Sequence, residues 1–162
     1  MRPTQWSRLV AVAAVAGALT WAGLRTWVVG GGYEPQLPWT MIAALLLIAV
    51  VVVGAGWPVR QWVRGDRARR IDALRAARTA VLGKASAYAG ALLLGWFGGQ
   101  VAHYAAHVGI DARRERMWLA LAAAVASLLV AAAGLLVERW CRVPPERGPH
   151  EEPGPPDRVE QG

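Results

Sequence analysis

The sequence is poor in the side chains with which enzymes do chemistry. Its 162 residues include one cysteine, Cys141, one lysine, Lys84, and three histidines. A lone cysteine excludes an intrachain disulfide and a metal cluster held by cysteines. No GxSxG, HExxH or phosphate-binding glycine loop occurs, and no pair of acidic residues falls inside an apolar segment. We therefore expect no catalytic residue, no resident metal and no cofactor, and the chain is predicted not to be an enzyme.

Strand signals are also missing, since the chain has no alternating apolar pattern and no Asn-Gly turn. It has instead four long apolar segments, at residues 9–29, 41–57, 85–108 and 117–137. Each approaches the length of about 20 residues with which an α-helix crosses the bilayer core. Lipid offers the backbone no hydrogen bonds, so such segments become helices. The sequence predicts an all-α integral membrane protein with four transmembrane helices in one domain, residues 1–142.

Basic residues lie mostly on one side of these segments. Fourteen of them precede the first segment, join the second to the third, or follow the fourth, whereas four lie in the other two loops. Basic residues of short loops stay in the cytoplasm. Both termini and the central loop are therefore predicted to be cytoplasmic, in a multi-pass protein of the cell membrane. The loop 111–116 opposes this orientation, because it carries three arginines.

The formal net charge of +7 could serve either nucleic acid or a membrane surface. The arginines flank the apolar segments and have no base-reading or stacking context. Anionic lipid headgroups are therefore the predicted partner, and nucleic acid is not. A membrane-protein partner remains a further expectation without a named identity.

Three segments at the boundaries need interpretation. Segment 61–83 forms either an amphipathic helix on the inner leaflet or an inward extension of the third span, which we favour because arginines interrupt its apolar face. The first span has a cleaved signal peptide as its alternative, but it exceeds the usual apolar region of about 7–15 residues. The proline-rich, charged segment 143–162 is predicted to be a disordered cytoplasmic tail.

The third span carries a stripe of small residues, formed by Ala87, Ala91, Gly95 and Gly99. Small side chains at every fourth position let another helix backbone approach closely, and this packing replaces the hydrophobic effect that lipid removes. The stripe predicts contacts inside the four-helix domain, and a homodimer seam is its alternative.

Another face of the third span is expected to carry polar residues: Gln100, His103, Tyr104, His107 and Asp111. Two histidines four residues apart can place both imidazoles on one metal. Without a clear third ligand, we favour residues near the outer surface that water and headgroups satisfy. No metal site is predicted, and the polar face is kept as a candidate site because polar groups in a span are often functional.

Other polar and aromatic side chains have simpler interpretations. At the inner interface we expect Lys84 to extend to the headgroups, and Glu138 to pair with Arg142 or with the central loop. Thr20 and Ser127 are expected to bond their own helices. Most tryptophans fall at the two membrane surfaces, whereas Trp21 and Trp96 are predicted to pack between helices.

Four runs carry a resemblance to a known family: LPWT, GWPVR, LRAARTAVLGKASAYAGALLLGW and LLVERWCRVPPE. Together they resemble the actinobacterial membrane family called domain of unknown function 3180, over about residues 1–146. The sequence departs from that pattern at Ala73, where a proline often precedes the Leu-x-Ala-Ala-Arg run. The resemblance implies a multi-pass membrane protein with no assigned activity.

The sequence therefore predicts a small membrane protein of unknown function, as a non-enzymatic accessory or scaffold. The alternative is a small transporter or channel component that uses the outer polar face of the third span. A membrane enzyme is the second alternative. A transporter is expected to show broken helices or charged groups in mid-membrane, and the sequence indicates neither.

Overall fold

The computed structural model describes residues 5–31, 37–63, 73–105 and 111–141. They form four α-helices, which are α1 (Trp6–Val29), α2 (Trp39–Val63), α3 (Ala73–Ala105) and α4 (Asp111–Trp140). All four are long and apolar enough to cross a membrane, and the described residues contain no strand. The predicted all-helical fold with four membrane-spanning helices is confirmed. The tail predicted at 143–162 lies outside the described residues.

α3 is longer than the third predicted span. It begins at Ala73 and has 33 residues, which correspond to about 50 Å of helix at about 1.5 Å per residue. A bilayer core of about 30 Å cannot cover that length. Residues 73–83 are therefore an extension of the third span, as we favoured, whereas residues 64–72 lie outside the described part of the chain.

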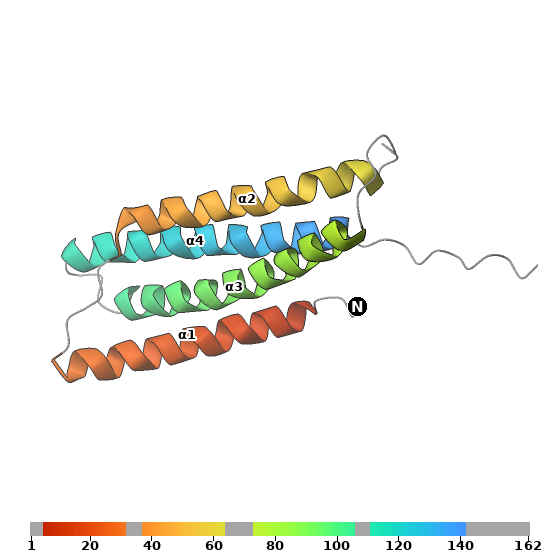
Figure 1. Ribbon diagram of the computed structural model, residues 1–162. Helices are drawn as coiled ribbons and strands as arrows, with labels where there is room; N and C mark the ends of the chain where they lie inside the picture. Colours follow the sequence, from red (N-terminus) through yellow and green to blue (C-terminus); the bar gives the residue numbers. More distant parts are fainter. Residues whose placement is uncertain (1–4, 32–36, 64–72, 106–110, 142–162) are drawn as a thin grey trace, which may run out of the picture.

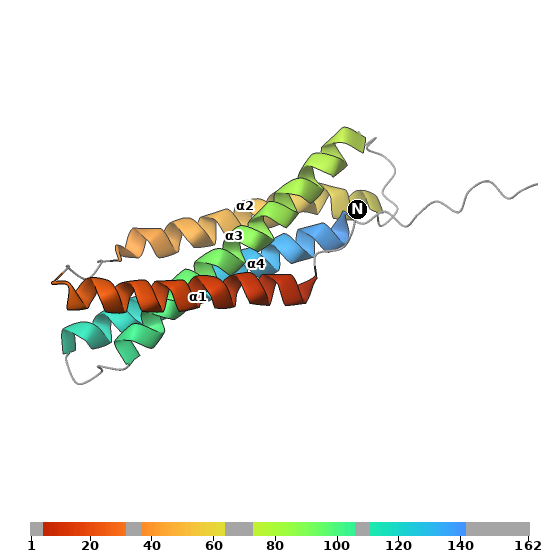
Figure 2. The ribbon, with the colours of Figure 1, turned by 90° about the horizontal axis from the view of Figure 1, so that it is seen from below.

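The helices form an open row in the order α1, α3, α4, α2 (Figure 1). In the described part of the chain, the backbone of α1 packs only on α3, and α2 packs mainly on α4. Figure 2 shows that α3 crosses α1 obliquely. The chain order and the spatial order differ, so the first two helices occupy opposite edges of the row and do not contact each other.

The centre of the row is the contact between α3 and α4, where small residues bring the backbones together. A Cβ on Gly90 would lie 2.5 Å from the nitrogen of Ala131, and a Cβ on Gly134 would lie 2.5 Å from the nitrogen of Ala87. Ser127 is fully buried nearby and donates a hydrogen bond to the carbonyl of Ala123 at 2.8 Å. The prediction that Ser127 bonds its own helix is confirmed.

Several tryptophans are exposed at the surface of the row. Trp21 is 40% exposed and Trp96 is 49% exposed, so the prediction that both pack between helices is wrong. The physical reason is that lipid accepts large apolar rings, whereas close helix contacts require small residues. Depth in the membrane therefore does not imply burial in protein.

The turn after α1 forms where the sequence is richest in glycine. Gly30 donates its N–H to the carbonyl of Thr26 at 3.0 Å, and Gly31 donates to Val28 at 3.1 Å. Gly31 has a φ of 81°, a conformation that costs glycine little because it lacks a Cβ. Pro38 then directly precedes α2, and its carbonyl accepts from the N–H of Met41 at 3.0 Å.

Candidate functional site: a lipid-facing groove and a buried polar cluster

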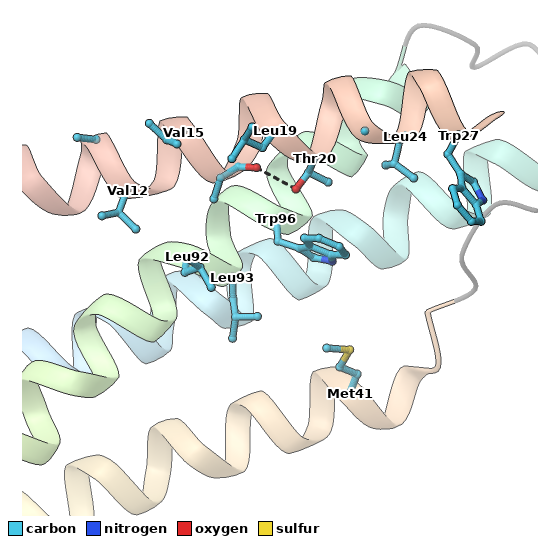
Figure 3. Close-up of a pocket in the computed structure, with 13 residues that line it drawn as sticks. Val12, Val15, Leu19, Thr20, Leu24, Trp27, Met41, Leu92, Leu93 and Trp96 are labelled. Atoms are coloured by element: carbon cyan, nitrogen blue, oxygen red, sulfur yellow. Dashed lines mark hydrogen bonds between the residues drawn. The ribbon is translucent and has the colours of Figure 1, made fainter. Parts of the chain in front are cut away.

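A long groove separates α1 from α2, with α3 as its floor. Its volume is about 1170 Å³. Figure 3 shows Leu93 and Trp96 of α3 beside the space between the two helices, with Met41 of α2 and Leu19 and Trp27 of α1 around it. The groove exists because α1 and α2 lie at opposite edges of the row, so neither covers the face of α3 between them.

The lining of the groove is mostly apolar. Thr20 is the only described lining residue with a hydroxyl, and its Oγ1 already donates to the carbonyl of Ala16 at 2.9 Å. This bond confirms that Thr20 satisfies itself within its own helix, as expected. The remaining described lining residues are apolar, apart from the indole N–H groups of Trp27 and Trp96. Among the described residues, no charged side chain lines the groove. An apolar chain is therefore the chemistry that this surface accepts.

The groove is long enough for a hydrocarbon chain. It follows α1 from Ala11 to Trp27, a length of about 24 Å at about 1.5 Å per residue. An extended apolar chain can lie along this length.

The stripe of small residues on α3 brings α1 close to the groove floor. A Cβ on Gly95 would collide with the carbonyl oxygen of Ala13, and one on Gly99 would lie 2.5 Å from the carbonyl oxygen of Gly17. Ala87 and Ala91 are buried as well, at 0% and 4% exposure. The structure thus places the four stripe residues, Ala87, Ala91, Gly95 and Gly99, inside the row of helices.

The polar residues of α3 are buried, which differs from the outer-surface position that we favoured. Gln100 and Tyr104 are each 1% exposed, and His103 is 9% exposed. The rings of His103 and Tyr104 meet edge to face, with centroids 5.6 Å apart. The three residues, named here the polar cluster, thus lie within protein, where the sequence alone indicated water and headgroups.

Gln100 places a polar side-chain atom in a buried position. Its Oε1 is buried and has no hydrogen-bond partner among the described residues. A buried acceptor left unpaired costs about 1–3 kcal/mol. A buried acceptor of this kind requires an explanation, and a bound group that donates a hydrogen bond to it would be one.

The other two residues of the predicted polar face do not join the cluster in the structure. Asp111 begins α4, so its placement on the third span is wrong, because that stretch contains the connection between two helices. His107 lies outside the described residues. Among the residues that are described, no three His, Cys, Asp or Glu side chains are grouped so that they could hold a metal ion.

The end of the row that carries Arg8, Arg60, Lys84 and Arg139 is named the basic end. Lys84 is exposed there. Glu138 is half-buried beside α3, with its backbone nitrogen 3.1 Å from the position of a Cβ on Gly83. The expected partner of Glu138, Arg142, lies outside the described residues.

An arginine held by two tryptophans at the basic end was not foreseen. The guanidinium of Arg60 lies 5.3 Å from the ring centre of Trp57 and 4.9 Å from that of Trp140. The two rings also meet edge to face at 6.3 Å. The spacing of Trp57 and Arg60 on one helix face gave a signal, but Trp140 comes from α4, which sequence spacing cannot place. Cation–π contacts fix this arginine where α2 meets α4.

Residues 9–145 match the family described as "Protein of unknown function (DUF3180)". No curated protein and no solved structure matches the chain.

Proposed function

This chain belongs to the family of proteins of unknown function DUF3180, and from that premise we propose that it is a non-enzymatic accessory protein that holds a long-chain lipid between α1 and α2. The observation that carries the proposal is the groove, whose apolar walls follow α1 for about 24 Å and suit an extended chain. The described residues include no catalytic group facing the groove. The apolar lining of the groove suits the binding of a lipid chain.

The test is lipid retention during purification from native membranes. Gly23 lines the groove, and a Cβ there meets nothing within 4 Å. Gly23→Phe therefore fills the groove without displacing the backbone. We expect native mass spectrometry to find a bound lipid on the wild-type protein and to find that this variant has lost it.

A matched control is available on α2. Gly54 also has nothing within 4 Å of an added Cβ, and it does not line the groove. Gly54→Phe should retain lipid as the wild type does. Equal retention by all three proteins, or a second polypeptide in place of lipid, would overturn the proposal.

The orientation that we propose places the basic end in the cytoplasm, against anionic headgroups of the cell membrane. The asymmetry of basic residues supports this orientation. The position of Arg60 between Trp57 and Trp140 suits the headgroup level of a membrane surface. A reporter active only in the cytoplasm should work at Gly162, and one active only outside should work in Gly30–Gly32. A silent reporter at either place contradicts this orientation.

A small transporter component is the second candidate, and the burial of the polar cluster favours it. Polar groups within a span are costly and often line the path of a solute. If the cluster forms such a path, His103→Ala should abolish flux of that solute into vesicles that contain the purified protein. Unchanged flux in the variant, or no flux in the wild type, removes this candidate.

A further inference from the structure

A second groove lies between α1 and α4, separate from the first groove, which lies between α1 and α2. It is lined by residues of α1, α3 and α4 and has a volume of about 390 Å³. Leu92 lines the first groove, and Leu94 lines the second. At about 100° per residue, these two side chains lie on nearly opposite faces of α3. The two grooves share no described lining residue, so each can have its own occupant.

The second groove differs from the first in the charge of its lining. Arg139, a residue of the basic end, lines it and is exposed. The apolar lining residues Leu128 and Leu135 precede Arg139 on α4 by eleven and four residues. At about 100° per residue, these intervals place them about 20° and 40° from Arg139 around the helix. The guanidinium therefore lies on the same face of α4 as the apolar wall of the groove.

The length of the second groove matches one leaflet. Along α4 it runs from Leu128 to Arg139, a length of about 17 Å at about 1.5 Å per residue. This is about half of a bilayer core of about 30 Å. α1 begins where α4 ends (Figure 1), and its first residue, Trp6, also lines the groove. Tryptophan prefers the headgroup level, so the groove has an apolar part at the depth of lipid tails and a cationic end at the headgroups.

The chemistry of Arg139 sets the charge of the occupant. A guanidinium stays charged and binds phosphate through paired hydrogen bonds. The basic end also carries Arg8, Arg60 and Lys84, and basic residues near a membrane surface attract anionic headgroups. Glu138 lies at this end too, but it does not line the groove. A lipid with an apolar chain and a net negative headgroup is therefore complementary to the second groove along its whole length.

We infer that the second groove binds an anionic phospholipid of the leaflet at the basic end, with an acyl chain between α1 and α4 and its phosphate on Arg139. This goes beyond the proposed function, because it assigns a second lipid, of stated charge, to residues that the first groove does not use. The first groove can lose its lipid without any effect on this site.

Two photoreactive lipids test the charge of the occupant. The first is phosphatidylglycerol and the second is phosphatidylcholine, each with a diazirine at the end of one acyl chain. They share the tails and the phosphate, and only phosphatidylglycerol has a net negative charge. α4 contributes no described residue to the first groove, so labelling of α4 reports on the second. In phosphatidylcholine nanodiscs, we expect phosphatidylglycerol to label α4 with an affinity about fivefold above that of phosphatidylcholine, as one basic residue near the surface predicts.

A pair of charge variants locates this preference. Arg139→Gln removes the charge from an exposed position, so the two lipids should label this variant equally. Arg8→Gln is the matched control, because Arg8 is exposed at the same end and lines neither groove. It should keep the preference of the wild-type protein.

A pair of bulky variants locates the acyl chain. Ala132 and Ala122 are both exposed on α4, and only Ala132 lines the second groove. Ala132→Phe should therefore prevent saturable labelling of α4 by both lipids, whereas Ala122→Phe should behave as the wild type. Gly23→Phe, which fills the first groove, should leave the labelling of α4 unchanged.

Equal labelling of wild-type α4 by both lipids overturns the inference, and this comparison requires no variant to fold. A preference for phosphatidylglycerol that survives in Arg139→Gln, or that Arg8→Gln also removes, overturns the role of Arg139. Labelling that Ala132→Phe does not reduce, or that Gly23→Phe abolishes, overturns the second groove as a separate site. A dimer in the nanodiscs that Ala132→Phe dissociates would mean that another copy of the chain covers this groove, and it would overturn the inference as well. None of these outcomes depends on lipid retention in the first groove, which tests the proposed function separately.

Discussion

α2 and α4 are both strongly apolar helices, but they occupy opposite environments. In the most apolar stretch of each helix, 17% of the residues of α2 and 56% of those of α4 are buried. α2 is rich in leucine, isoleucine and valine, whereas α4 is rich in alanine and contains Ser127 and Gly134. Lipid is as apolar as leucine, so apolarity does not drive a helix inward. Between these two helices, the smaller side chains of α4 allow the closer packing at the centre of the row.

The strongest way to break this comparison is to place a bulky residue at the centre. Gly90→Leu puts a Cβ within 2.5 Å of the backbone nitrogen of Ala131, which cannot move aside cheaply. We expect a loss of about 3 kcal/mol or more, because overpacking forces the two helices apart. Thermal unfolding in detergent measures it. Gly54→Leu on α2 is the control and should change stability by less than about 0.5 kcal/mol, and equal midpoints for both variants would refute the role of residue size.

The contact between α1 and α3 should show a smaller effect of the same kind. Gly95→Leu and Gly99→Leu should each cost about 1–3 kcal/mol, since both sites lie against the backbone of α1. Leu93→Ala, which removes a half-buried side chain from the groove floor, should cost less than either. Thermal unfolding midpoints of the three variants in one detergent measure these losses of stability. A larger loss for Leu93→Ala would mean that the stripe is not the main contact that holds α1 on α3.

A third pair of changes sharpens the comparison within α2 itself. Leu45 is 5% exposed and Leu47 is 64% exposed. Leu45→Ala should cost about 1–2 kcal/mol, less than the 2–5 kcal/mol typical of a core surrounded by water. In a membrane the variant loses packing contacts, but it loses no free energy of transfer from water, because lipid is as apolar as leucine. Leu47→Ala should be near neutral. Equal losses would show that α2 is covered on both faces.

The smallest effect concerns the place where α2 and α4 meet at the basic end. Burial raises the pKa of the Cys141 thiol above its ordinary value of 9.0, so the reactive thiolate is scarcer at any given pH than in the unfolded chain. Labelling of the folded protein with a maleimide at pH 7 should be several-fold slower than labelling of the unfolded chain, and it should accelerate as the pH rises. Trp57→Ala, which removes the ring that meets Trp140, should restore part of the rate, and equal rates in folded and unfolded protein would contradict the packing of α2 on α4.

The number and type of the helices could be predicted from the sequence because lipid leaves the backbone a single choice. The stripe on α3 could be recognised by its spacing, and the groove could not, because it depends on which helices are neighbours. Gln100 and Tyr104 illustrate the same limit. Their position near the outer end of the span indicated contact with water. Their burial depends on which helices pack on α3, and the local sequence does not reveal those neighbours.

The order of helices in the row has a consequence for the biogenesis of the protein. Membrane helices insert first and associate afterwards, and the chain leaves the ribosome from its N-terminus. Because α1 packs on α3 and α2 packs mainly on α4, the first hairpin to be made has no internal contact to stabilise it. Its two helices remain separate in the bilayer until their partners are made. Tertiary structure can begin when α3 joins α1, and α2 gains its main partner only with α4.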